Sequence, residues 1–244
     1  MLSYLGFLTL AGLAACGTNA GHAVSDAPQT TATSGATQIS PVSSTTDVET
    51  ATPKPRPKFA AKISHVSRDQ VTYSWRASCP VSYKNLRMIT MTHWGFDKQV
   101  HTGRLIVNES AAEDLVSVFH KLYDQHYPIK RMEPVDKYKG DDYRSIDADN
   151  TSAFNCRPAT GSSNWSQHAY GLALDLNPLE NPWVNADGTN AHRNADKYVK
   201  RPLHKPGVIN ANDHVVKAFA KIGWGWGGDW SGAKDYQHFS STGR

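Results

Sequence analysis

The hydrophobic residues of this chain recur with two different periods, and both periods predict short elements of secondary structure. Runs rich in β-branched and aromatic residues predict strands at 71–75, 86–91 and 103–108. Apolar residues from Leu115 to Tyr123 instead recur every three or four positions, as on one face of a helix. The residues from Ser110 to Glu113 match a capping box, so we expect the helix to begin there and to end before Pro128.

A second helix is predicted near residue 213. Asp213 is a suitable N-cap, the residues from Val215 to Ile222 supply an apolar face, and Gly223 stops the helix. Strands and helices do not alternate regularly along the chain. We therefore expect an α+β fold, with a small and mostly antiparallel sheet and flanking helices, and not a wound parallel sheet.

The first sixteen residues have the pattern of an export signal. Residues 2–15 are apolar or small, and the segment is too short for a permanent membrane-spanning helix. It ends in Leu-Ala-Ala-Cys16, which resembles the signal of bacterial lipoproteins, where the cysteine thiol receives a diacylglycerol. No Lys or Arg precedes Lys54, so the usual basic start is missing. The alternative is the apolar start of a folded domain, but no amphipathic period follows.

Residues 17–58 are rich in Ser, Thr, Ala and Pro and contain no aromatic residue. Such a composition cannot bury enough apolar area to offset the entropy of ordering the chain. We expect a disordered tether at 17–58 that links a lipidated Cys16 to a folded domain at 59–244. The protein would then be exported and would face the cell wall from a membrane anchor.

Charge and cysteine content narrow the possibilities further. The 26 basic and 22 acidic residues leave a net charge of only +4, with no basic stripe, which argues against a nucleic-acid partner. If Cys16 is lipidated, Cys79 and Cys156 remain as an even pair in an oxidising compartment. We expect these two cysteines to form a disulfide; the alternative is two buried free thiols.

One candidate for metal chemistry lies between residues 166 and 177. The leucines at 172, 174 and 176 alternate with Ala173 and Asp175, which on a strand places Asp175 on the opposite face. His168 precedes this strand, and Gly171 allows the chain to turn between them. The two side chains can therefore meet at one metal ion, although a buried Asp satisfied by backbone donors would give a similar pattern.

A second candidate follows a run of tryptophan and glycine at 223–230. Asp235 lies just upstream of His238, close enough to flank a metal ion bound by that histidine. Core packing with tight turns would explain the tryptophans. It does not explain an Asp and a His so near them.

Together these segments resemble the zinc D-alanyl-D-alanine carboxypeptidase and L-alanyl-D-glutamate endopeptidase family, which has the Hedgehog/DD-peptidase fold. The matching motifs are Ser-x-His-x-x-Gly-x-Ala-x-Asp at 166–175, then Gly-Trp-x-Trp-Gly-Gly-Asp-Trp at 223–230 and Asp-x-x-His at 235–238. The resemblance covers about residues 79–239. Asp at position 235 matches the endopeptidase branch, whereas vancomycin-resistance D,D-peptidases usually carry Glu there.

The resemblance implies a role for each matching residue. His168, Asp175 and His238 would bind one zinc ion and leave a coordination position for water, as in catalytic zinc sites. Asp235 would be the general base. Asp229 is a rival for this role, but it lies outside the Asp-x-x-His motif.

Two more residues acquire expected roles from the same resemblance. Arg157 would lie near the substrate carbonyl or carboxylate, where its planar cation suits an oxyanion, and Cys156 would hold its loop in place. The alternative for Arg157 is a surface ion pair. Ser166 would either bind substrate or orient His168.

The implied function is zinc-dependent hydrolysis of an amide bond in the stem peptide of peptidoglycan, either the L-Ala-D-Glu bond or the terminal D-Ala-D-Ala bond. A serine peptidase is disfavoured, because the Ser-x-x-Lys at 231–234 has no Lys-Thr-Gly after it. A zinc-containing wall-binding module of the same fold is the other alternative. The nine remaining histidines are expected to be exposed or satisfied side chains, least clearly His93 and His101.

Overall fold

The structure is a computed structural model, and it describes residues 57–244. The strands are β1 (Ala61–His65), β2 (Leu86–Trp94), β3 (Val100–Asn108), β4 (Arg131–Met132), β5 (Asn150–Thr151), β6 (Ala173–Asp175), β7 (Trp183–Val184), β8 (Gly225–Trp226), β9 (Lys234–Asp235) and β10 (His238–Ser240). The α-helices are α1 (Ala112–Asp124), α2 (Asp142–Asp147) and α3 (His214–Ala220). Short 3-10 helices occur at 68–71, 83–85, 109–111, 135–138, 167–170, 193–198 and 227–229. The α+β fold class is therefore confirmed.

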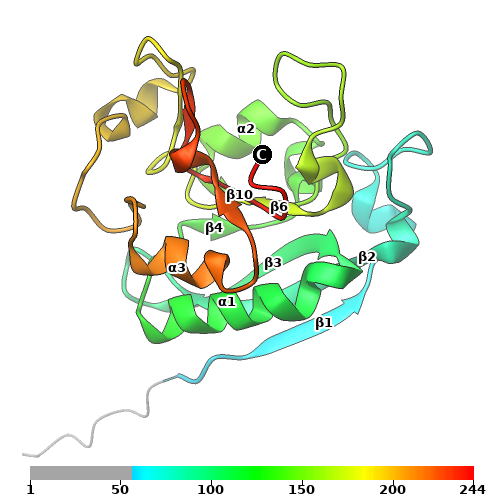
Figure 1. The fold of residues 1–244 in the computed structure, drawn as a ribbon. Coiled ribbons are helices and arrows are strands. Elements are labelled where there is room, and N and C mark those ends of the chain that lie inside the picture. Colours follow the sequence, from blue (N-terminus) through cyan, green and yellow to red (C-terminus); the bar gives the residue numbers. More distant parts are fainter. Residues whose placement is uncertain (1–56) are drawn as a thin grey trace, which may run out of the picture. The chain divides into compact units, whose positions relative to one another are not determined.

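The longest strands form an antiparallel sheet in the order β1-β2-β3, and α1 lies along this sheet (Figure 1). Alternate residues of β2 face two hydrophobic clusters. Ile89 and Met91 join α1 in the larger cluster, whereas Leu86 and Met88 join a smaller cluster with Val71. Because both faces are covered, apolar residues occur at both odd and even positions of β2.

Helix α1 has the predicted apolar face but not the predicted cap. The Asn108 side chain accepts a hydrogen bond from Ser110 N at 3.1 Å and starts a 3-10 turn at 109–111. The α-helix begins only after this turn, and Ala111 at its N-cap has no side-chain cap. The expected capping box at 110–113 is therefore wrong, because the last residue of β3 already caps the entry to the helix.

A second small sheet has the order β6-β10-β8, and all its pairings are antiparallel. Helix α3 covers it, and the rings of Phe219 and Phe239 stack with centroids 3.9 Å apart. Asp213 caps α3 as predicted, with its carboxylate accepting from Val215 N and Val216 N. Two further pairs, β4-β5 and β7-β9, complete the fold, and β4-β5 is parallel. The strands of the described residues therefore form several small sheets, most of them antiparallel, and not a single sheet.

The predicted strand at 71–75 is wrong, because Val71 ends the 3-10 helix at 68–71 and residues 72–74 form a turn. Asp136 accepts hydrogen bonds from Tyr73 N at 2.8 Å and from the Ser74 hydroxyl. A carboxylate therefore satisfies backbone donors that a neighbouring strand would otherwise satisfy. The indole of Trp75 packs on the smaller cluster and donates to Val81 O at 2.8 Å, so its burial needs no sheet.

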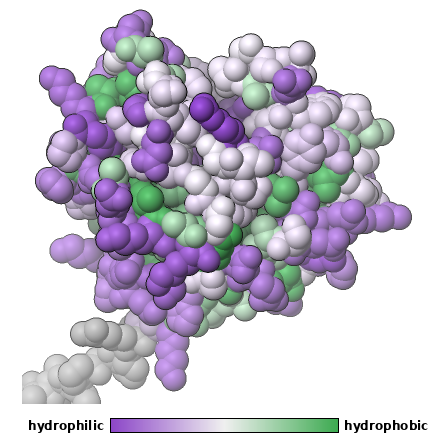
Figure 2. Space-filling view, in the orientation of Figure 1, coloured by the Kyte–Doolittle hydropathy of each residue, from purple (hydrophilic) through white to green (hydrophobic). Residues whose placement is uncertain are grey.

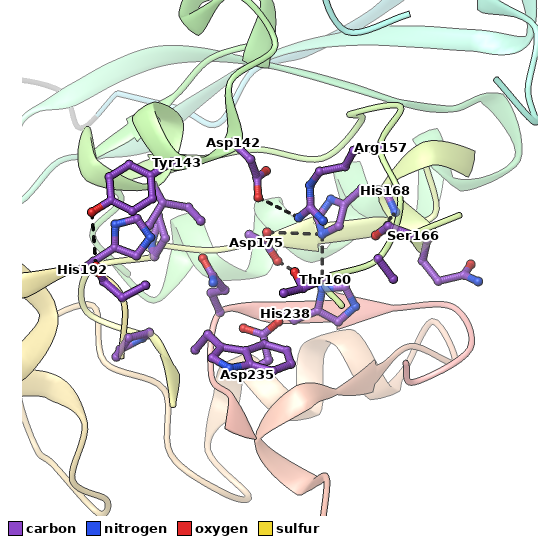
Figure 3. Close-up of a pocket in the computed structure, with 18 of the residues that line it drawn as sticks. Asp142, Tyr143, Arg157, Thr160, Ser166, His168, Asp175, His192, Asp235 and His238 are labelled. Atoms are coloured by element: carbon purple, nitrogen blue, oxygen red, sulfur yellow. Dashed lines mark hydrogen bonds and ion pairs between the residues drawn. The ribbon is translucent and has the colours of Figure 1, made fainter. Parts of the chain in front are cut away.

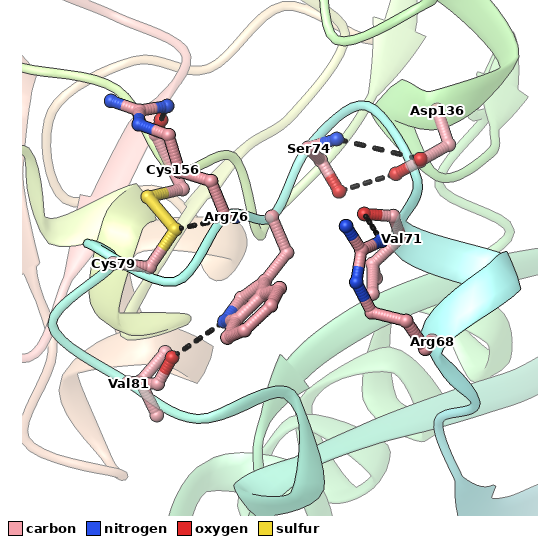
Figure 4. Close-up of a disulfide and its surroundings, with 9 residues drawn as sticks. Arg68, Val71, Ser74, Arg76, Cys79, Val81, Asp136 and Cys156 are labelled. Carbon is pink, nitrogen blue, oxygen red and sulfur yellow. Dashed lines mark hydrogen bonds between the residues drawn. A yellow bond between two sulfur atoms is a disulfide. The ribbon is translucent and has the colours of Figure 1, made fainter.

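Cys79 and Cys156 form a disulfide, as predicted (Figure 4). Arg76 reinforces the same junction, because its guanidinium donates to Cys156 O at 2.7 Å. The disulfide thus joins the segment before β2 to the loop that carries Arg157.

On the face shown in Figure 2, hydrophobic residues form small patches separated by hydrophilic ones. Within residues 57–244, no helix has the length and apolar character needed to cross a membrane. The predicted signal at 1–16, the lipidated Cys16 and nearly all of the predicted tether at 17–58 lie outside the described residues.

Candidate functional site

Three buried side chains converge on one point (Figure 3). Nε2 of His168 lies 3.2 Å from Asp175 Oδ2, and Nδ1 of His238 lies 3.1 Å from Asp175 Oδ1. The two imidazole nitrogens are 3.2 Å apart. Each of the three residues is at most 5% exposed. In the described part of the chain, this is the one group of His, Cys, Asp and Glu side chains suited to a metal ion.

The pairing of β6 with β10 places two of these residues side by side. His238 and Asp175 are direct partners in the antiparallel register, although 63 positions separate them. His168 arrives from the 3-10 turn at 167–170, which Gly171 ends with a φ of 69°. A Cβ atom on Gly171 would also lie 2.5 Å from Asn108 N, so both conformation and space favour glycine there.

Backbone contacts orient His168. Its Nδ1 lies 2.5 Å from Ala153 O, which fixes Nδ1 as the protonated nitrogen and leaves the lone pair on Nε2 facing the site. The Ser166 hydroxyl accepts from His168 N at 3.3 Å and caps the turn. Ser166 therefore orients His168, and it also lines the cleft described below.

The donor set fits a zinc ion. Ligand atoms of a tetrahedral zinc lie about 2.0–2.1 Å from the metal, so they lie about 3.3–3.4 Å from one another. The three separations here are 3.1–3.2 Å, close to that value, with His168 Nε2 facing one oxygen of Asp175 and His238 Nδ1 facing the other. The Nε2 lone pair of His168 and the Asp175 carboxylate meet His238 Nδ1 in a buried space, where a cation could bind all three groups. Two imidazoles and one carboxylate leave a fourth position open.

Electrostatics around Asp175 are consistent with a cation site. Burial alone would raise the pKa of Asp175, but the charges and hydrogen bonds of His168 and His238 lower it below its usual range. Burial opposes protonation of His238, whereas its hydrogen bond to Asp175 raises its pKa overall. The Asp175 carboxylate is therefore ionised and ready to hold a positive charge.

Asp235 lies on β9 and lines the same cleft, and it is 8% exposed. Its Oδ1 is buried and has no hydrogen-bond partner among the described residues. Burial, followed by the charge of Asp175, raises the pKa of Asp235 to about 7. Gly227 allows this position, because a Cβ atom on it would lie 2.5 Å from Asp235 O. A carboxyl group with such a pKa can take up and release a proton near neutral pH.

The site opens into a cleft of about 640 Å³. Arg157 lines one wall, and its guanidinium forms an ion pair with Asp142 at 2.9 Å. Arg157 therefore lines the cleft and forms an ion pair, while its expected contact with an oxygen of the substrate stays a prediction. Asp229, the rival base, does not line this cleft.

The structure thus brings together the predicted residues Arg157, Ser166, His168, Asp175, Asp235 and His238. The sequence analysis missed the wall formed by α2, which contributes Asp142 and Tyr143. A signal for this helix existed, because Asp141 is a good N-cap and accepts from Arg144 N at 3.1 Å. Nothing in the sequence indicated that α2 would face the cleft.

The other histidines of the described residues lie outside the metal cluster. His93 is buried on the β2-β3 hairpin, with its ring 5.7 Å from that of His101, which pairs with Asp97. His192 lines the cleft, but its Nδ1 is bonded to Asp147 at 2.7 Å. The expectation that these histidines are satisfied or exposed agrees with their contacts.

A comparison with protein families supports this reading of the cleft. Residues 160–241 match the family model described as D-alanyl-D-alanine carboxypeptidase. The match bears out the resemblance predicted from the motifs, and it supports a peptidase of the D-Ala-D-Ala carboxypeptidase type.

The carboxypeptidase match includes the three candidate metal ligands together with Ser166 and Asp235, but it begins after Arg157 and the disulfide. The assignments of Arg157 and Cys156 therefore rest on the motif resemblance and on their position in the structure. Among curated proteins and among solved structures, no match to the chain was found.

Proposed function

We propose that this chain is a zinc-dependent peptidase that hydrolyses an amide bond in the stem peptide of peptidoglycan. The observation that carries the proposal is the buried cluster of His168 Nε2, the Asp175 carboxylate and His238 Nδ1, with separations of 3.1–3.2 Å, in the same cleft as Asp235. The carboxypeptidase family match supports the reaction class.

The metal ligands are proposed to be His168, Asp175 and His238. A zinc ion held there would lower the pKa of a bound water to about 7 and polarise the scissile carbonyl. Ala153 O holds the proton on Nδ1 of His168, so that Nε2 keeps its lone pair. The ionised Asp175 carboxylate supplies the negative charge of the ligand set.

Asp235 is proposed to carry the proton in the reaction. Its carboxylate would accept a proton from the attacking water and donate it to the leaving amine, which needs a group that titrates near neutral pH. Arg157 is proposed to donate hydrogen bonds from its guanidinium to a carbonyl or carboxylate oxygen of the substrate.

We further propose that the protein is exported and anchored by lipid on Cys16, with residues 17–58 as the tether between membrane and domain. The Cys79–Cys156 disulfide supports export, because structural disulfides persist in oxidising compartments. The proposed partners are the stem peptides of the wall and, through the anchor, the membrane.

The test is digestion of purified peptidoglycan stem peptides by the zinc-loaded protein, followed by detection of new amino termini. Mass spectrometry of the products then identifies the bond, because loss of one alanine indicates the carboxypeptidase and cleavage after L-Ala indicates the endopeptidase. Zinc-dependent release that is lost in Asp235→Asn supports the proposal. Zinc binding without release from any wall peptide would favour a binding module instead.

A further inference from the structure

The cleft contains an ion pair that neither the motifs nor the proposed function accounts for. Arg157 Nη2 lies 2.9 Å from Asp142 Oδ2, and the two side chains line the same wall (Figure 3). Their side chains are only 24% and 32% exposed, so water screens this pair less than an ordinary surface pair. Within residues 57–244, Asp142 is the only acidic residue that forms an ion pair with Arg157.

The rest of the Arg157 guanidinium is held weakly. Nη1 donates to the carbonyl of the next residue, Pro158, at 3.3 Å. Nε is buried and has no hydrogen-bond partner in the described part of the chain. An arginine side chain is long and has many rotamers, so its strongest contact decides where the planar group lies. That contact is the Asp142 carboxylate.

Asp142 is itself fixed in place. It is the first residue of α2, directly after the N-cap Asp141. Its Oδ1 accepts a hydrogen bond from Asn155 Nδ2 at 3.4 Å, and Asn155 N donates to His168 O at 3.1 Å. Asp142 is therefore tied through Asn155 to the turn that carries one of the proposed metal ligands.

Two other carboxylates, Asp175 and Asp235, line the same cleft and would attract a mobile cation. Arg157 forms no ion pair with either of them in the described structure. In the zinc-loaded protein, a guanidinium released from Asp142 would be drawn toward Asp235 and would neutralise its charge.

We propose that Asp142 is the positioning residue of the cleft. Asp142 holds the Arg157 guanidinium at one wall, apart from Asp175 and Asp235. The Nη hydrogens of Arg157 that Asp142 does not bind would then be available to donate to an oxygen of the substrate. This inference rests on the proposed function, since Arg157 would act on the substrate of that reaction.

The first test is a double-mutant cycle with Asp142→Asn and Arg157→Ala in the zinc-loaded protein. Asp142→Asn should lower kcat/KM about 10- to 100-fold, as expected when a contacting group is misplaced by about 1 Å. Zinc content and Tm should stay at the wild-type values. In the Arg157→Ala background, Asp142→Asn should cause no further loss, because the residue that it positions is gone.

Glu109→Gln is the matched control. Glu109 also pairs with a half-buried arginine, Arg87, but neither residue lines the cleft. Its removal should leave kcat/KM unchanged, which separates the position of Arg157 from a general effect of breaking an arginine–carboxylate pair.

The second test does not depend on catalysis. In ¹⁵N NMR spectra, the Arg157 guanidinium should show separate, slowly exchanging Nη signals in the wild type and averaged signals in Asp142→Asn; the signals are assigned by their loss in Arg157→Lys. Unchanged signals, an additive cycle, or a wild-type rate for Arg157→Ala would each overturn the inference. If the wild type cleaves no wall peptide, the proposed function fails, and the NMR comparison still decides whether Asp142 positions Arg157.

Discussion

Nε2 of His168 lies 3.2 Å from Nδ1 of His238, although 70 positions separate the two residues in the chain. The protonated Nδ1 of His168 is already bonded to Ala153 O, so its Nε2 presents a lone pair to the other ring. His238 Nδ1 is hydrogen-bonded to Asp175 Oδ1 at 3.1 Å, and a zinc ion that binds all three groups would displace the shared proton. This relationship leads to the first prediction.

His238→Ala should abolish zinc binding by the purified protein. Loss of one of three ligands should weaken zinc affinity by more than the roughly 10- to 100-fold that loss of a supporting contact causes. The measurement is metal content by mass spectrometry after gel filtration. His101→Asn is a control, because His101 is a half-exposed histidine outside the cleft. Equal zinc content in His238→Ala and wild type would contradict the ligand assignment.

Asp235→Asn should retain zinc and lose turnover. General acid–base groups typically contribute about 10²- to 10⁴-fold to a rate, and the amide cannot accept and return a proton. Metal content and the rate of stem-peptide release would be measured on the same preparation. Asp229→Asn, which alters an acidic side chain outside the cleft, should behave as wild type. A wild-type rate for Asp235→Asn would show that another group is the base.

Glu180→Gln should stabilise the fold at alkaline pH. Burial, followed by the neighbouring charge of Asp149, raises the pKa of Glu180 to about 8. The protonated Glu180 side chain is compatible with the folded state, so the fold has its full stability below the ordinary glutamate pKa of about 4.3. This stability is lost as the pH rises through the folded-state pKa of about 8. The gain in unfolding free energy should therefore be near zero at pH 4 and about 1–2 kcal/mol at pH 9, once solvent screening is allowed for.

Urea titrations of both proteins at pH 4 and pH 9 would measure this difference. The same gain at both pH values would show that packing, and not ionisation of Glu180, is responsible.

Removal of the disulfide by the double change Cys79→Ser and Cys156→Ser should destabilise the domain. The two cysteines are 77 positions apart, so the cross-link restricts a long loop in the unfolded chain. The expected loss is about 2–5 kcal/mol in unfolding free energy. Urea titration of the double variant against oxidised wild type would measure it, and reduced wild type should match the variant. Identical midpoints would mean that the disulfide does not stabilise the domain.

Cys16→Ser should release the protein from membranes, because the serine cannot receive the lipid anchor. Fractionation of cells into membrane and soluble parts, followed by immunoblotting, measures the effect. A variant with an unchanged membrane fraction would refute the proposed anchor. The Cys79→Ser and Cys156→Ser double variant, which keeps Cys16, should stay with the membranes.

Local patterns predicted the elements whose burial follows a simple period. The apolar face of α1, the β2 and β3 strands and the Asp213 cap of α3 all follow from neighbouring residues. The segment at 71–75 shows where this reasoning fails. The backbone N–H of Tyr73 donates to the carboxylate of Asp136, 63 positions away, and no local pattern predicts that contact.

Local patterns were enough to predict the class of fold and the residue types of the candidate site, because a strand period around Asp175 and the spacing of Asp235 and His238 depend on neighbouring residues alone. Which of these groups meet depends on tertiary contacts. The register of β6 against β10 brings Asp175 beside His238, and the packing of α2 brings Asp142 to Arg157. Both depend on contacts between distant segments, which form only when the chain buries its apolar surface as a whole.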